Sequence, residues 1–263
     1  MVSFSICLIM ALASASSAHT ATCISPSIDA DRTIRSRTDS VEKGISGKLK
    51  GPFFSFLTVR PFTEKVNGRI GQYIIGFWPG EGKGVTSMAY RNPDRFIEVT
   101  RENQDTPVSD HFRLRDFLTK DQPNVWPKYV VLSERLIDKL ELVIADLNTR
   151  GVLVRHVSVM SGFRTPRYNG AGGEGRSGVS RHMYGDAADV FVDNDRNGRM
   201  DDLNRDGRVD HRDARVILES VERVERRYPS LAGGVGVYKA NSAHGPFAHV
   251  DVRGWRARWG LIG

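Results

Sequence analysis

The amino-acid sequence predicts an α+β fold, in which helices pack on one mostly antiparallel sheet and a small β-rich lobe precedes them. Two segments have the hydrophobic period of amphipathic helices, and four short β-branched segments surround them. The first half of the chain instead has short apolar stretches broken by glycine and proline. The order helix, strand, strand, helix, strand, strand is typical of helices packed on one antiparallel sheet.

The small β-rich lobe is predicted over residues 51–127. The stretches "FFSFLTVRPF", "GRIGQYIIGFWPGEGKG" and "RFIEVTREN" combine β-branched and aromatic residues with glycine and proline breaks. Tyr73, Phe77 and Trp78 are interpreted as core residues, because apolar side chains in short strands mostly pack inside. Contact of these aromatic rings with a glycan is the alternative.

The first helix is predicted within residues 131–152, with Ser133 as N-cap and Gly151 at its end. The second is predicted over residues 214–228, and strands over 156–164, 187–193, 233–238 and 247–252. The apolar residues of the first helix share one face: Leu136, Ile137, Leu140, Val143, Ile144 and Leu147.

The N-terminus has the pattern of an exported protein. Residues 1–22 form an apolar stretch that passes into small residues, which predicts a signal peptide, although its first five residues carry no Lys or Arg. Residues 23–50 are polar and predict a linker. We therefore expect the mature protein in the periplasm or cell envelope. A lipid anchor at Cys23 is disfavoured, because no Leu stands three residues before it.

Composition narrows the class of protein. The 263 residues carry a formal net charge of +7, with 40% hydrophobic and 26% charged residues, as in a soluble globular protein. No apolar run is long enough for a transmembrane segment. The positive charge suits an anionic envelope polymer, and no nucleic-acid-binding motif accompanies it. The mature chain would keep at most one cysteine and no internal disulfide. The oligomeric state stays open.

The stretch "DLNRDGRVDHRD" predicts an EF-hand-like calcium loop, within an acidic insertion over residues 193–213. Oxygen ligands at alternate positions around a tight turn are what Ca²⁺ requires, and Gly207 stands at the sharp turn. The preceding "DNDRNGRMD" starts the same pattern, as half of a pair or only a polar turn. A solvated acidic loop without an ion is the alternative. The predicted ligands are Asp202, Asn204, Asp206, Arg208 through its carbonyl, Asp210 and Asp213.

A second metal site is predicted from His182, Asp189 and His249. Asp189 opens an apolar strand, where a carboxylate is costly unless a metal or hydrogen bonds compensate it. His249 and Asp251 alternate on one face of a later strand. Two imidazoles and one carboxylate leave one position open, which is typical of catalytic zinc. A histidine satisfied within the core is the alternative for each imidazole.

Three motifs, "SGFRTPRYN", "SRHMYGDAADVFVD" and "FAHVDVRG", resemble the successive motifs of the zinc D-Ala-D-Ala carboxypeptidase family. That family shares its fold and metal triad with lysostaphin-type peptidases and the hedgehog domain. The resemblance covers roughly Lys128 to Trp259 and implies a peptidase domain over residues 128–263. Every fixed position of S-x-H-x-x-G-x-A-x-D is present: Ser180, His182, Gly185, Ala187 and Asp189.

The resemblance implies a role for each matched residue. His182, Asp189 and His249 would bind zinc, Arg164 would stabilise the oxyanion, and Ser180 would hold the substrate. The implied reaction is hydrolysis of peptidoglycan stem peptides by zinc-activated water, as a D-Ala-D-Ala carboxypeptidase or a related endopeptidase. The calcium segment would be an insertion after the second ligand.

One position departs from the family pattern. Relatives commonly carry Asp or Glu three residues before the last zinc histidine, as general base, and this chain has Pro246 there. His244 and Asp251 are the site residues nearest in sequence, and Asp251 would either reach the water or fix His249 from behind. Glu174 is a weaker alternative. The base stays unassigned.

Pro246 also keeps open a different class of function, a catalytically inactive zinc- and calcium-dependent cell-wall binding module. A calcium-dependent wall-binding protein, in which the acidic loop is the functional part, is a further alternative.

Overall fold

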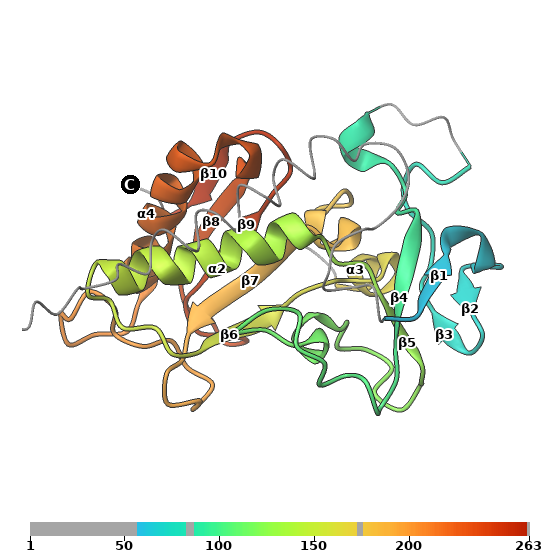
Figure 1. Cartoon of the computed structure of the whole chain (residues 1–263), viewed down its shortest axis with the longest axis horizontal. Coiled ribbons are helices and arrows are strands. Elements are labelled where there is room, and N and C mark those ends of the chain that lie inside the picture. The colour runs from blue at the N-terminus through green and yellow to red at the C-terminus, as the bar shows by residue number, and fades with distance from the viewer. Residues whose placement is uncertain (1–56, 83–86, 173–175, 262–263) are drawn as a thin grey trace, which may run out of the picture. The chain divides into compact units, whose positions relative to one another are not determined.

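The computed structural model describes residues 57–82, 87–172 and 176–261 (Figure 1). The predicted signal peptide, the linker and Glu174 lie outside the described residues. Among the helices that are described, none has the length and apolar character needed to cross a membrane.

The centre of the fold is a five-stranded sheet with the strand order β10-β8-β9-β7-β6. Its strands are β6 (Val157–Ser161), β7 (Ala187–Val192), β8 (Gly234–Tyr238), β9 (Phe247–Asp251) and β10 (Ala257–Gly260). Neighbours pair antiparallel except β8 and β10, which are parallel. The mixed helix and strand content confirms the α+β class. β10 was not predicted, because a four-residue edge strand leaves no readable alternation.

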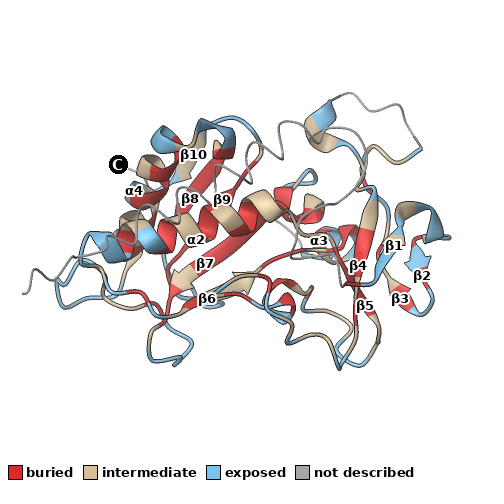
Figure 2. Cartoon of the chain, in the orientation of Figure 1, coloured by how far each residue is buried: buried red, intermediate tan, exposed pale blue. Residues whose placement is uncertain are grey.

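Two long helices, α2 (Glu134–Thr149) and α4 (His211–Arg227), pack against each other, and α4 also packs on β8 and β9 (Figure 1). The short α3 (Pro166–Gly170) follows β6. Small apolar residues with almost no exposure lie between the sheet and the helices, which places the core there (Figure 2). They include Val190, Val192, Val235, Val237, Ala248 and Val250.

The two long helices begin at or close to their predicted first residues. Ser133 is the N-cap of α2, but its side chain makes no capping bond, and its N–H donates to the Gly185 carbonyl at 2.8 Å. α4 begins at His211, three residues before the predicted start. The reason is a capping box, in which Asp210 and Asp213 each accept a backbone N–H of the first turn.

A buried ion pair joins both helices to the end of β9. Lys139 of α2 lies 2.7 Å from a carboxylate oxygen of Glu225 in α4, and it also donates to the Asp251 carbonyl at 2.7 Å. Burial lowers the pKa of Lys139, and the Glu225 carboxylate opposes this shift. Such a pair fixes the relative position of three elements, because separating it would leave a buried charge without a partner.

The β-rich lobe contains β1 (Val59–Pro61), β4 (Arg95–Val99) and β5 (Lys128–Val130) in one antiparallel sheet, and the two-stranded β2 (Arg69–Ile70) and β3 (Tyr73–Ile74). The predicted boundary before residue 128 falls inside this sheet, because β5 begins at Lys128 and pairs with β4. Tyr73 and Trp78 are core residues with 1% and 2% exposure, whereas Phe77 is 63% exposed, unlike the core position expected for it.

Candidate metal centre

The face of the central sheet that lies away from the helices carries a row of directly paired residues. Asp189 of β7 pairs with Ser161 of β6 on one side and with His249 of β9 on the other. His249 pairs in turn with Gly236 of β8, and Gly236 pairs with Trp259 of β10. Because paired residues point to the same face of a sheet, the strand register brings two predicted ligands together.

The third predicted ligand, His182, comes from a short 3-10 helix, Arg181–Tyr184, that leads into β7. Gly185 ends this helix with a left-handed φ of 69°. A Cβ at this position would overlap the Val131 carbonyl, so both the conformation and the space require glycine. The glycine of the sequence motif therefore turns the chain so that His182 faces the start of β7.

The donor atoms of the three residues converge. Nε2 of His182 lies 3.2 Å from Oδ1 of Asp189 and 3.1 Å from Nδ1 of His249, and that Nδ1 lies 2.9 Å from the same Oδ1. All three side chains are buried. The structure thus brings the predicted zinc ligands together in one group.

The other nitrogen of each imidazole has a partner of its own. Nδ1 of His182 lies 2.7 Å from the Gly162 carbonyl, and Nε2 of His249 lies 3.1 Å from Oδ2 of Asp251. When these nitrogens donate, Nε2 of His182 and Nδ1 of His249 keep their lone pairs. The partners therefore direct one lone pair of each imidazole toward the centre of the group.

Protonation in this group follows from burial and from the close contacts. Burial lowers the pKa of His182, which favours the neutral imidazole that a metal requires. Burial alone would raise the pKa of Asp189, but the two histidines hold it well below its usual value. Burial would lower the pKa of His249, and hydrogen bonds to Asp189 and Asp251 raise it instead.

The donor set and spacing fit zinc. Tetrahedral bonds of 2.0–2.2 Å place neighbouring ligand atoms about 3.3 Å apart, close to the 2.9–3.2 Å separations here. Two imidazoles and one carboxylate match the catalytic class of zinc site, and each imidazole has the outer partner that such sites use.

Asp251, predicted either to reach the water or to fix His249, is placed for the second role. Its side chain is fully buried, and Oδ1 accepts the Gly234 N–H at 2.7 Å. Arg253 donates to both oxygens, and Oδ2 contacts the His249 nitrogen that points away from the group. With both oxygens engaged, Asp251 orients His249.

Arg164 lies beside the triad. It follows β6, one of its terminal nitrogens contacts Oδ2 of Asp189, and Nε donates to the Ser161 hydroxyl at 2.7 Å. Its side chain is 14% exposed. A half-buried guanidinium beside the predicted metal ligands provides fixed positive charge that could stabilise an oxyanion.

The structure does not bring His244 and Ser180 into direct contact with the triad. His244 is half-buried in a turn, bonded to Asn241 at 2.9 Å, and its ring packs edge-on against Phe247. Ser180 is the N-cap of the Arg181–Tyr184 helix and makes no capping bond through its side chain. Pro246 is buried immediately before β9.

The predicted calcium loop is held by its own backbone. Asp202 accepts the N–H groups of Asp206 and Gly207 at 3.2 and 2.8 Å. Similarly, Asn204 accepts the Asp206 N–H, and Asp206 accepts the Arg208 N–H. These four positions are thus held by bonds within the turn.

The end of the loop caps α4. Asp213 is fully buried and accepts the backbone N–H groups of Leu203 and Asp210, both at 2.8 Å. Asp210 pairs with Arg212. Among described residues, the acidic oxygens that converge within 4.8 Å lie one turn earlier, on Asp193, Asp195 and Asp201.

Sequence reasoning missed the residues that support the triad. Trp259 lies against His249, with ring centroids 5.1 Å apart, and its indole occupies the space that the missing side chain of Gly236 leaves. Trp259 also donates to the Tyr238 hydroxyl at 2.6 Å. The signal was present in "GGVGVY", where glycines at alternate positions of a strand leave one face open to a large neighbour.

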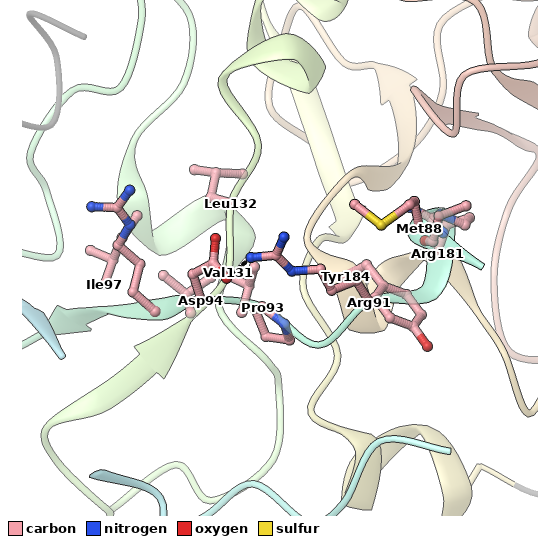
Figure 3. A pocket seen from close by; sticks show the side chains of 12 residues that line it. Met88, Arg91, Pro93, Asp94, Ile97, Val131, Leu132, Arg181 and Tyr184 are labelled. Carbon is pink, nitrogen blue, oxygen red and sulfur yellow. Dashed lines mark hydrogen bonds and ion pairs between the residues drawn. The ribbon is translucent and has the colours of Figure 1, made fainter. Parts of the chain in front are cut away.

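A cavity of about 330 Å³ lies elsewhere (Figure 3). Met88, Ile97 and Val130 contribute apolar lining, and Arg181 and Tyr184 border it from the helix that carries His182. No predicted site residue lines it.

Comparison with known proteins agrees with this geometry. The model of the Peptidase M15 family matches residues 128–222, which include His182, Asp189 and Arg164. His249 and Asp251 lie beyond the matched segment. No curated protein and no solved structure matches the chain significantly. Residues 128–222 are therefore similar to the Peptidase M15 family.

Proposed function

We propose that the chain is an exported zinc metallopeptidase that hydrolyses peptidoglycan stem peptides, as a D-Ala-D-Ala carboxypeptidase or a related endopeptidase. The match of residues 128–222 to the Peptidase M15 family supports a metallopeptidase. The observation that carries the proposal is the convergence of His182, Asp189 and His249 beside the half-buried Arg164. The net charge of +7 supports an anionic wall polymer as the carrier of the substrate.

Separate residues are proposed to bind the metal ion, to stabilise the oxyanion and to shield the site. Zinc, when bound, polarises the scissile carbonyl and activates water. His182 and His249 hold the ion as neutral imidazoles, and Asp189 supplies the negative ligand. Arg164 presents its guanidinium to the oxygen that becomes negative during attack. The bulk of Trp259 shields His249 on the β10 side.

The proton acceptor is proposed to be His244. In the described residues, the carboxylates that contact the triad histidines are Asp189, itself a ligand, and Asp251, which is saturated. His244 reaches the same face through its edge-on contact with Phe247, two residues before His249. Both of its ring nitrogens are bonded within the turn, to the Asn241 amide at 2.9 Å and the Gly245 carbonyl at 2.8 Å, so the turn over residues 241–245 would have to open before the imidazole could take a proton.

The test combines metal content with wall chemistry. Purified mature protein and His182→Ala are measured for zinc, and both are incubated with purified peptidoglycan while D-Ala and shortened stem peptides are quantified. We expect one zinc and peptide release for the wild type, and neither for His182→Ala. His211→Ala, a change at a half-exposed histidine in the first turn of α4, is the matched control and should keep both.

The inactive binding module is the second candidate, and Pro246 in the usual acidic position favours it. A wild-type protein that binds one zinc and sediments with peptidoglycan, yet releases no peptide, would establish this candidate in place of the enzyme.

Calcium binding by residues 193–213 is a separate proposal, supported by the spacing of the two turns. Calorimetric titration of Ca²⁺ into wild type, Asp206→Asn and Asp195→Asn distinguishes the turns. Loss only in Asp206→Asn assigns the predicted loop, and loss only in Asp195→Asn assigns the earlier cluster. No binding by the wild type rejects calcium.

Export is proposed from residues 1–22. Expression of the full chain in a bacterium, followed by mass determination of the N-terminus from the periplasmic fraction, should show cleavage before residue 23. A full-length cytoplasmic product would contradict it.

A further inference from the structure

Residues 117–119 of the β-rich lobe run alongside the loop that carries Arg164. The Phe163 N–H donates to the Phe117 carbonyl at 2.9 Å. A Cβ on Gly162 would lie 2.5 Å from the Cα of Phe117, so only glycine permits this approach. The lobe segment lies outside the family match, which begins at residue 128.

Within this segment, Thr119 forms hydrogen bonds to both residues that flank Arg164. Its side chain is buried, and its hydroxyl donates to the Phe163 carbonyl at 3.0 Å. The same oxygen accepts the Thr165 N–H at 3.2 Å. One hydroxyl thus uses both its donor and an acceptor site on the two residues that flank Arg164.

The remaining contacts of Arg164 are with the metal centre. Its own N–H donates to the His182 carbonyl at 3.2 Å, and its side chain contacts Ser161 and Asp189. The guanidinium can hold this position only while the backbone at residue 164 stays in place. Thr119 holds that backbone through its bonds to Phe163 and Thr165.

A second contact joins the lobe to the same centre. The indole N–H of Trp78, which is 2% exposed, donates to the Met183 carbonyl at 2.9 Å. Met183 directly follows the ligand His182. The lobe therefore holds the backbone beside two of the site residues, across 105 residues of sequence for the Trp78 contact.

We propose that Thr119 is a positioning residue for Arg164, and that the β-rich lobe serves the active site by holding its two loops. The catalytic part of this inference rests on the proposed peptidase function. A bond that fixes a charged side chain matters most in the transition state, where a misplacement of about 1 Å costs up to about 100-fold in rate.

The test uses Thr119→Val, which keeps the shape and removes the hydroxyl, and Thr119→Ser, which restores it. For Thr119→Val we expect kcat on a soluble stem peptide to fall about 10- to 100-fold, with KM and the single zinc retained. Thr119→Ser should return to near wild type. Thr100→Val is the matched control, because the Thr100 hydroxyl bonds only within its own turn of the lobe.

Two measurements do not depend on activity. Hydrogen exchange at the Thr165 amide should become faster in Thr119→Val and not in Thr119→Ser. The nitrogen resonance of the Arg164 Nε–H group, which reports its bond to Ser161, should shift in Thr119→Val. If Thr119→Val does not fold, Thr119→Ala replaces it, since the smaller side chain adds no bulk.

The outcomes separate the inference from the function. An unchanged Arg164 resonance, or wild-type kcat in Thr119→Val, overturns the inference while the peptidase stands. Thr119→Ser as impaired as Thr119→Val overturns it too, because then the hydroxyl is not the cause. A wild type that cleaves no stem peptide contradicts the proposed function. The hydrogen-exchange and resonance data then still test whether the Thr119 hydroxyl positions Arg164.

Discussion

The metal centre and the acidic turns of residues 193–213 contain similar residues that the fold uses in opposite ways. In the metal centre, Nε2 of His182, Nδ1 of His249 and Oδ1 of Asp189 face one another within 3.2 Å. In the acidic turns, Asp202 and Asp213 accept backbone N–H groups of their own segment. Spacing in sequence identifies both patterns, and only the direction of the donor atoms separates them.

The cost of an unpaired acceptor explains this difference. A buried carboxylate needs donors or a cation. Asp213 obtains its donors from the start of α4, as a capping residue. The nitrogens of the triad have their outer partners already, so their remaining lone pairs converge on a space that a cation suits.

The largest expected effect breaks the metal centre and spares the turns. Asp189→Asn removes the negative ligand, so we expect zinc content to fall from one per chain to near zero and peptide release to fall to background. Asp195→Asn makes the same chemical change at an exposed position of the acidic turns and should keep the zinc. Loss of zinc in both variants would show that the two regions are one site.

A smaller effect on zinc binding is expected at Asp251, which contacts His249 and is not itself one of the three predicted ligands. Asp251→Asn keeps an oxygen for the Gly234 N–H but removes the charge that orients His249, so zinc affinity should fall about 10- to 100-fold. Competition with a chelator measures this directly. Unchanged affinity, with an unchanged melting temperature, would mean that Asp251 does not orient the ligand.

Removing the Asp213 carboxylate from the acidic turns is expected to lower the stability of the fold and to leave the zinc content unchanged. Asp213→Ala leaves the buried N–H of Leu203 and the partly buried N–H of Asp210 without acceptors and removes the capping box of α4. We expect the free energy of unfolding to fall by about 1–3 kcal/mol, measured by urea denaturation. Zinc content should stay at one per folded chain. A loss of zinc from folded protein would contradict the separation.

The smallest expected effect is a difference in pH dependence between the metal centre and the acidic turns. Hydrogen bonds raise the pKa of His249 above its usual value, so protons compete with zinc and the zinc affinity should already fall as pH drops toward that usual value from above. The Arg212 side chain lowers the pKa of Asp210 to about 2. Its stabilising contribution is therefore complete above the unfolded pKa of about 3.9 and is lost as pH falls toward about 2.

Thermal melts of zinc-free wild type and Asp210→Asn test that last step. Their difference should be constant near neutral pH and disappear in the acid range. A difference that persists at the lowest pH would assign the stabilisation to another group.

The residues that converge in the triad could be predicted from the sequence, because the spacing of His182 and Asp189 and the alternation of His249 and Asp251 are local. The choice of ring nitrogen was not predictable, since it depends on Gly162 and Asp251, which only the fold brings near. Thr119 lies 44 residues from Phe163, so no local pattern links them. The calcium loop stays a prediction, because spacing cannot show that Asp213 bonds to backbone N–H groups.

Trp259 gives the protein an optical property of its own. Its indole lies 5.1 Å from the His249 ring, while the other three tryptophans of the chain lie outside this row. Cobalt or copper in the centre would quench the emission of this indole through close contact with an open electron shell. Tryptophan fluorescence then reports metal binding and release in unlabelled protein over time. The variant Trp259→Phe identifies the part of the signal that comes from this site.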